Sequence, residues 1–62
     1  MQSVYLLTPL NEQATDWINE NLCLEGWQWQ GNSAAIEHRY IGDIVEGMIN
    51  DGLVNDTDFT VS

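Results

Sequence analysis

Residues 33–53, with the sequence SAAIEHRYIGDIVEGMINDGL, change their hydrophobic period once, and this change decides the fold. The first part, residues 34–38, has the apolar pattern of a strand. From Tyr40 onward, apolar residues recur at helical spacing as far as Ile49, and Gly52 is placed to end the helix in a left-handed conformation. The stretch therefore predicts a strand that passes directly into an amphipathic helix.

A second strand is expected immediately upstream. Residues 27–30, WQWQ, alternate strictly between apolar and polar, which is typical of a half-buried strand. Gly31 and Asn32 suit a two-residue type II′ turn, so the two strands would form a hairpin. Trp27 and Trp29 share one face of this strand, either in the core under the helices or on the open face as an anchor for a partner.

The N-terminal part predicts a further strand and helix. Residues 3–8, SVYLLT, are apolar on both faces, as in a central strand. A helix follows to about residue 22, with Thr8 as its cap and Pro9 in its first turn, or with Asn11 as an alternative cap. One face of this helix is apolar and is formed by Leu10, Ala14, Trp17, Ile18 and Leu22.

Residues 57–61, TDFTV, alternate again and complete the order β-α-β-β-α-β. Right-handed crossovers around a central hairpin lead to an α+β fold of the ferredoxin-like, split βαβ type, with two helices on one face of an antiparallel sheet. If residues 57–61 form no strand, the alternative is a three-stranded β-α-β-β-α domain. The predicted core consists of Val4, Leu6, Ala14, Trp17, Ile18, Ile36, Ile41, Ile44, Val45 and Met48.

Length and charge narrow the functional classes. The 62 residues form a single small domain, residues 1–62, in which 44% of residues are hydrophobic, so the chain is not a disordered acidic tail. The net charge is −9, from ten acidic residues against Arg39, and there is no lysine. Direct binding of nucleic acid is disfavoured because one cation cannot neutralise a row of phosphates. A basic protein surface is the natural complement.

The sequence also indicates the cellular compartment in which we expect the protein. No stretch has the length needed to span a membrane, and no secretory signal precedes the first strand. Cys23, the one cysteine, suits a reducing environment. We therefore expect a cytoplasmic protein without membrane contact.

The residues that could carry chemistry form no motif. His38 and Cys23 are isolated in the sequence, and there is no phosphate-binding loop, nucleophile elbow or metalloprotease motif. Oxygen-bearing residues cluster near Gly52, but their spacing does not match a calcium-binding loop, so we expect a solvated acidic loop; they are Asp51, Asn55, Asp56 and Asp58. The sequence predicts no enzyme, no catalytic residue, no metal site and no cofactor.

Acidic residues follow the polar side of both predicted helices. Glu12, Asp16 and Glu20 are four residues apart in the first helix, and Asp43 and Glu46 lie in the second. Like charges at this spacing destabilise a helix by about 0.2–0.5 kcal/mol per pair, and no lysine relieves them. Because both helices pack on the same side of the sheet, we predict that these five residues form a partner-binding surface.

In its small size, acidity and lack of lysine, the chain resembles the small inhibitor proteins of phages and mobile elements, namely the DNA-mimic anti-restriction and anti-CRISPR proteins. Those proteins place carboxylates where the phosphates of a nucleic acid would lie and so occupy a basic groove. The resemblance implies an inhibitor of a nucleic-acid-binding protein. The alternative is a homodimeric assembly module that pairs through its open sheet face, with Tyr5 and Leu7 or the two tryptophans exposed there.

Overall fold

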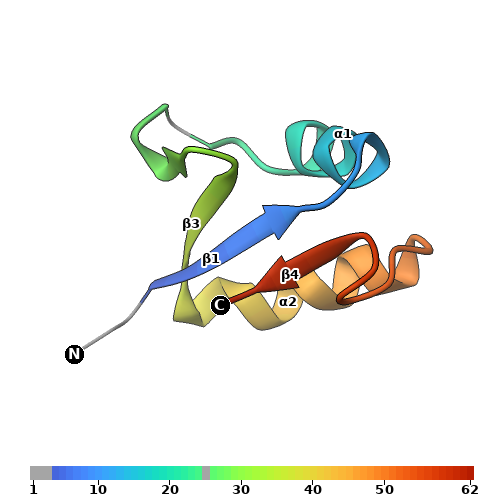
Figure 1. Cartoon of the computed structure of the whole chain (residues 1–62). Helices are drawn as coiled ribbons and strands as arrows, with labels where there is room; N and C mark the ends of the chain where they lie inside the picture. Colours follow the sequence, from blue (N-terminus) through green and yellow to red (C-terminus); the bar gives the residue numbers. More distant parts are fainter. Residues whose placement is uncertain (1–3, 25) are drawn as a thin grey trace.

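The computed structural model describes residues 4–24 and 26–62, with the backbone alone for residue 27 (Figure 1). Within these residues the strands lie in the order β2-β3-β1-β4, and every neighbouring pair is antiparallel. This is the α+β, ferredoxin-like βαββαβ arrangement expected from the sequence, and the three-stranded alternative is wrong. The elements are β1 (Val4–Pro9), α1 (Glu12–Asn21), the 3-10 turn η1 (Gly26–Gln28), β2 (Trp29–Gln30), β3 (Ser33–Glu37), α2 (His38–Asn50) and β4 (Phe59–Val61).

Both helices lie on one face of the sheet. Side chains from α1, α2 and three strands form a single buried cluster, whose largest fully buried members are Phe59, Leu7, Ile18 and Met48. Figure 1 shows the sheet from its other face, with α2 passing behind β4. The predicted core residues Ala14, Ile18, Ile36 and Met48 are confirmed as buried, and Trp17, Ile41, Ile44 and Val45 pack against them.

The register of β1 corrects the predicted core. Leu7 pairs with Ala34 of β3 and Val61 of β4 and is completely buried under the helices. Successive strand residues point to opposite faces, so Val4 and Leu6 lie on the other side, where they are only half-buried. The prediction that Val4 and Leu6 belong to the core is therefore wrong, as is the suggestion that Leu7 lies on the exposed face.

The first helix begins later than Pro9. β1 continues through Pro9, whose partner on β4 is Phe59, so the prediction of Pro9 in the helix with Thr8 as cap is wrong. Asn11, the alternative, is the cap, because its side-chain oxygen accepts the backbone N–H of Ala14 at 2.9 Å. The backbone N–H of Leu10 donates to the carbonyl of Asp58 and therefore points toward β4. Because the backbone groups of successive strand residues point to opposite sides, the nitrogen of Pro9 points away from β4. The N–H that proline lacks therefore costs the β1–β4 ladder no hydrogen bond.

The hairpin and its flanking elements differ in length from the prediction. Gly31 has φ +66°, as the first position of a type II′ turn requires. β2 has only two residues, because residues 26–28 form a 3-10 turn instead of the predicted strand. Trp29 is half-buried and packs against the core, which confirms the core interpretation for this residue. The side chain of Trp27 lies outside the described part of the structure.

The second helix starts at His38, directly after β3, and its end confirms the predicted glycine cap. Gly52 has φ +96° and donates to Ile49, while Leu53 donates to the carbonyl of Met48 at 3.0 Å. β4 begins two residues later than expected because the N–H groups of Thr57 and Asp58 bond back to Val54.

The two helices contact each other through Trp17. Its indole N–H donates to the carboxylate of Asp51 at 2.5 Å, and its ring lies against Gly47 in α2. A Cβ at residue 47 would be 3.3 Å from the Trp17 ring, which is a tight contact. The glycine therefore costs helix propensity but lets α1 approach α2 closely.

Candidate partner-binding surface

The three acidic residues of α1 lie on its outer side. Ala14 and Ile18 are fully buried, and at 3.6 residues per turn Glu12, Asp16 and Glu20 fall away from them and are exposed. Glu12 is in the first turn, where the helix dipole favours a carboxylate, but the last turn contains no basic residue. Glu20 is therefore exposed without a compensating charge from its own helix.

The acidic residues of α2 are likewise exposed. Met48 is fully buried, and Asp43 and Glu46 point away from it into solvent. Arg39 lies four residues before Asp43, but its guanidinium pairs with Glu37 instead, at 2.8 Å. The hydrogen bond and the charge of Glu37 raise the pKa of Arg39, and the electrostatic interaction with Tyr40 adds to this. The guanidinium also lies 5.5 Å from the centre of the Tyr40 ring. Arg39 is the one lysine or arginine of the chain, and it pairs with Glu37 and not with the acidic residues of the helices.

The two helices lie on the same face of the sheet and meet through side chains. Trp17 in the middle of α1 contacts the last part of α2, and Leu22, just after α1, lines the same hollow as Tyr40 and Ile44 in the first half of α2. The segment that follows Glu20 and the first half of α2, which carries Asp43, therefore border the same hollow. We call the set Glu12, Asp16, Glu20, Asp43 and Glu46 the acidic helix face. No ion pair involves these five side chains within the described residues.

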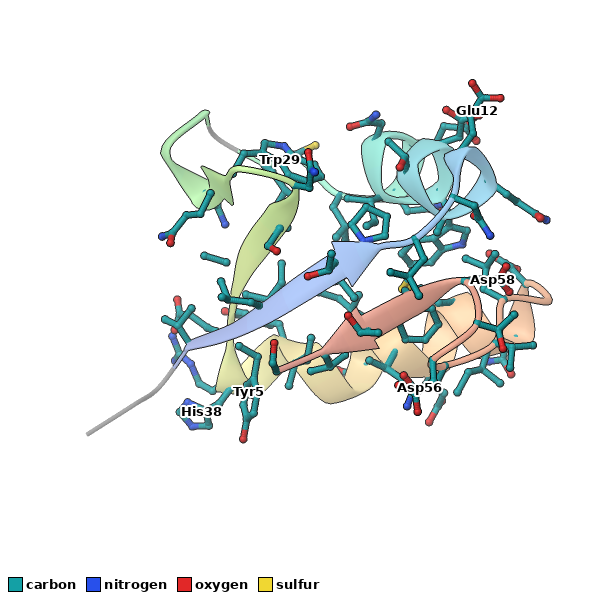
Figure 2. The ribbon with its side chains drawn as sticks, in the orientation of Figure 1. Tyr5, Glu12, Trp29, His38, Asp56 and Asp58 are labelled. Carbon is teal, nitrogen blue, oxygen red and sulfur yellow. The ribbon has the colours of Figure 1, made fainter. Side chains whose placement is uncertain are left out.

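Two other carboxylates hold the fold together, and sequence reasoning did not identify their role. Asp58 accepts the side-chain amide of Asn11 at 2.6 Å and the backbone N–H of Val54 at 2.7 Å, so it joins the start of α1 to the loop before β4. Asp51 accepts the Trp17 indole. Figure 2 shows Asp56 and Asp58 in the loop between α2 and β4, and Glu12 on the outer side of α1. The structural role of these carboxylates depends on partners far away in the sequence.

The loop after α2 was expected to be a solvated acidic loop. Its Asn55 and Asp56 are exposed, and Asp56 adopts a left-handed conformation with φ +70°. Asp58, in contrast, is half-buried and hydrogen-bonded. In the part of the chain that the structure describes, no three His, Cys, Asp or Glu side chains converge as a set of metal ligands.

A surface hollow of about 230 Å³ lies between the segment after α1 and the first half of α2. Its lining is mainly apolar and consists of Leu22, Cys23, Leu24, Gln28, Ile36, Glu37, Tyr40 and Ile44. Cys23 is exposed at its rim, whereas His38 lies near Tyr5 at one end of the sheet (Figure 2). Across the described ranges, no hydrogen bond joins the side chain of Cys23 or of His38 to another residue.

No protein-family model matches the sequence, and no curated protein or solved structure gives a significant match to the chain. The helices in the described ranges are all too short or too polar to cross a membrane. The fold and the charged surface of the chain itself are thus the features from which its function can be argued.

Proposed function

We propose that this chain is a non-enzymatic binding protein that occupies a basic surface of a partner protein through its acidic helix face. The observation that carries the proposal is the grouping of five exposed carboxylates on the outer sides of α1 and α2, without an ion pair, in a chain of net charge −9. Both helices belong to one layer, so a single partner surface can reach all five.

The arrangement works against the stability of the isolated chain. Glu12, Asp16 and Glu20 repel one another at successive turns, and each such pair costs about 0.2–0.5 kcal/mol. A basic partner would turn this cost into attraction and would speed the encounter by electrostatic steering. Net charge alone would give solubility, but it does not require the acidic residues to follow one helix at four-residue intervals.

A nucleic-acid-binding protein is the kind of partner that fits best. Its groove is lined with lysine and arginine that normally contact phosphates. Carboxylates four residues apart on α1 are about 6 Å apart along the helix axis, at 1.5 Å per residue. A single DNA strand presents one phosphate per about 3.4 Å of axis. The acidic helix face would thus match about half of the phosphate positions along one strand and inhibit the partner by occupying its groove.

The test compares two double variants that each make the net charge less negative by two. Asp16→Asn with Glu20→Gln acts on the acidic helix face, and Asn55→Lys with Thr57→Lys acts on exposed positions of the loop after α2. A basic nucleic-acid-binding protein is captured on the immobilised chain at about 50 mM salt, and its dissociation constant is then measured by calorimetry at about 50 and 500 mM.

We expect the helix-face variant to bind about 10-fold or more weakly, and the loop variant to lose less, through long-range steering alone. The affinity of the unmodified chain should fall as salt rises. Unchanged binding by the helix-face variant would show that another surface is used, and equal losses in both variants would show that only net charge matters.

A further inference from the structure

The face of the sheet opposite the helices is the second surface with a distinct composition. The ladder register places on it Val4, Leu6 and Thr8 of β1, Gln30 of β2, Ser33, Ala35 and Glu37 of β3, and Thr60 of β4. Neither helix covers this face, because the core cluster that both helices contact contains the opposite set of strand residues. We call these eight residues the open sheet face.

The one charged side chain of the open sheet face is that of Glu37, opposite Val4 at the end of β3. Its carboxylate pairs with Arg39, the one arginine of the sequence, at 2.8 Å. In a chain of net charge −9, the uncovered side of the sheet is therefore close to neutral, whereas the outer sides of both helices are acidic.

The side chains of this face are also mostly short and already ordered. The hydroxyl groups of Thr8 and Ser33 are hydrogen-bonded to each other across the strands at 2.7 Å, and Ala35 is only 9% exposed. The one charged side chain of the face, Glu37, is already held by its ion pair with Arg39. Binding here would therefore cost little side-chain entropy.

We propose that the open sheet face binds a second copy of this chain, back to back, to form a two-fold dimer. The distribution of charge selects this occupant. Two copies repel each other wherever carboxylates meet, and this face is where they can approach while their acidic residues point outward. In a two-fold dimer the same surface of each copy forms the interface, so the open sheet face would pack against its own equivalent. The helix layers then lie on the two outer sides, so both acidic helix faces remain accessible.

The size of the face makes the dimer weak. With strands about 4.8 Å apart and about 3.3 Å per residue, four short strands give a contact of about 300 Å² per copy. Stable complexes bury about 800 Å² per partner, so we expect dissociation constants in the range of about 10 µM to 1 mM. Because both copies are acidic, salt should strengthen the dimer. Binding of a basic partner should respond to salt in the opposite direction.

Sedimentation equilibrium over about 10 µM to 1 mM protein, at about 50 and 500 mM salt, tests the proposal. The disrupting variants are Leu6→Glu and Thr60→Glu, on the two neighbouring strands of the open sheet face. The matched control is Ile49→Glu, which adds the same charge at a 52%-exposed aliphatic residue of α2. Circular dichroism checks that each variant is folded.

We expect the unmodified chain and Ile49→Glu to dimerise, with a dissociation constant about 3-fold or more lower at high salt. Leu6→Glu and Thr60→Glu should be monomeric over the same range. If Leu6→Glu does not fold, Thr60→Glu decides. A monomer at 1 mM in both salts, or dimers that survive both substitutions, would overturn the proposal. Neither result would affect the helix-face test above, which uses different residues and a different partner.

Discussion

The helix layer and the open sheet face differ in how they carry charge. On the helix layer, five carboxylates point into solvent from two adjacent helices, and no ion pair in the described structure relieves them. The open sheet face presents aliphatic, hydroxyl and amide side chains, and its one carboxylate, Glu37, is paired with Arg39. A solvent-facing side of an antiparallel sheet usually carries polar and charged residues. The excess acidity is thus confined to particular surfaces.

This difference indicates that the two surfaces suit different partners. The acidic helix face is suited to a basic surface, whose attraction weakens as salt rises. The open sheet face is suited to a like-charged copy, whose repulsion weakens as salt rises. A single salt series therefore separates the two kinds of binding, because the two dissociation constants should move in opposite directions.

The largest expected effect separates the two faces of β1. Leu7→Ala removes a completely buried side chain and should lower the free energy of unfolding by about 2–5 kcal/mol. Leu6→Ala, one residue away on the half-buried open sheet face, should cost less than about 1.5 kcal/mol. Urea denaturation measures both, at about 5 µM protein so that self-association does not contribute. Equal costs would mean that β1 does not have the register described here.

The phase of β1 is the part of the fold that sequence reasoning could not determine. Residues 4–7 are four apolar or aromatic residues in succession, so either alternate set could face the helices. The helices had no such ambiguity, because their apolar stripes are separated by polar residues, and Ala14, Ile18 and Met48 are buried as predicted. Burial also depends on the position along the strand. Tyr5 pairs with the buried Ile36 and shares its face of the sheet, but Tyr5 is itself 41% exposed.

An effect of intermediate size on stability should distinguish carboxylates that form structural hydrogen bonds from carboxylates that are only exposed on the surface. Asp58→Ala removes hydrogen bonds to Asn11 and Val54 and should lower the free energy of unfolding by about 1–3 kcal/mol. Asp16→Ala removes an exposed carboxylate that forms no ion pair in the described part of the structure, and it should be neutral or slightly stabilising. Thermal unfolding followed by circular dichroism distinguishes the two. An equal response would remove the structural role assigned to Asp58.

Sequence reasoning placed the acidic helix face but not the structural carboxylates, for a physical reason. The positions of Glu12, Asp16 and Glu20 follow from the local helical period, so their exposure could be predicted. The partners of Asp58 and Asp51 depend on how distant segments pack. Asn11 is 47 residues from Asp58, and Trp17 is 34 residues from Asp51. The matching of Gly47 to the Trp17 ring is equally long-range, and no local pattern indicates it.

The smallest expected effect concerns the repulsion within the helix layer itself. Raising salt from about 50 to 500 mM shortens the screening length to a few Å, which should weaken repulsion between exposed carboxylates one helical turn apart. The pairs Glu12–Asp16 and Asp16–Glu20 together cost on the order of 0.5–1 kcal/mol, so their relief should raise the melting temperature by about 2–6 °C.

The double variant Asp16→Asn with Glu20→Gln isolates this contribution from the general effect of salt on protein stability. Both pairs lose a charge in this variant, while the helix keeps its length, its Asn11 cap and its buried residues. We expect the variant to melt at a higher temperature than the unmodified chain at low salt and to gain less from added salt, measured by differential scanning calorimetry at about 5 µM or the lowest workable concentration. If both chains gained equally, the repulsion would come from the remaining acidic residues. The carboxylates of α1 would then carry no stability cost for a basic partner to relieve.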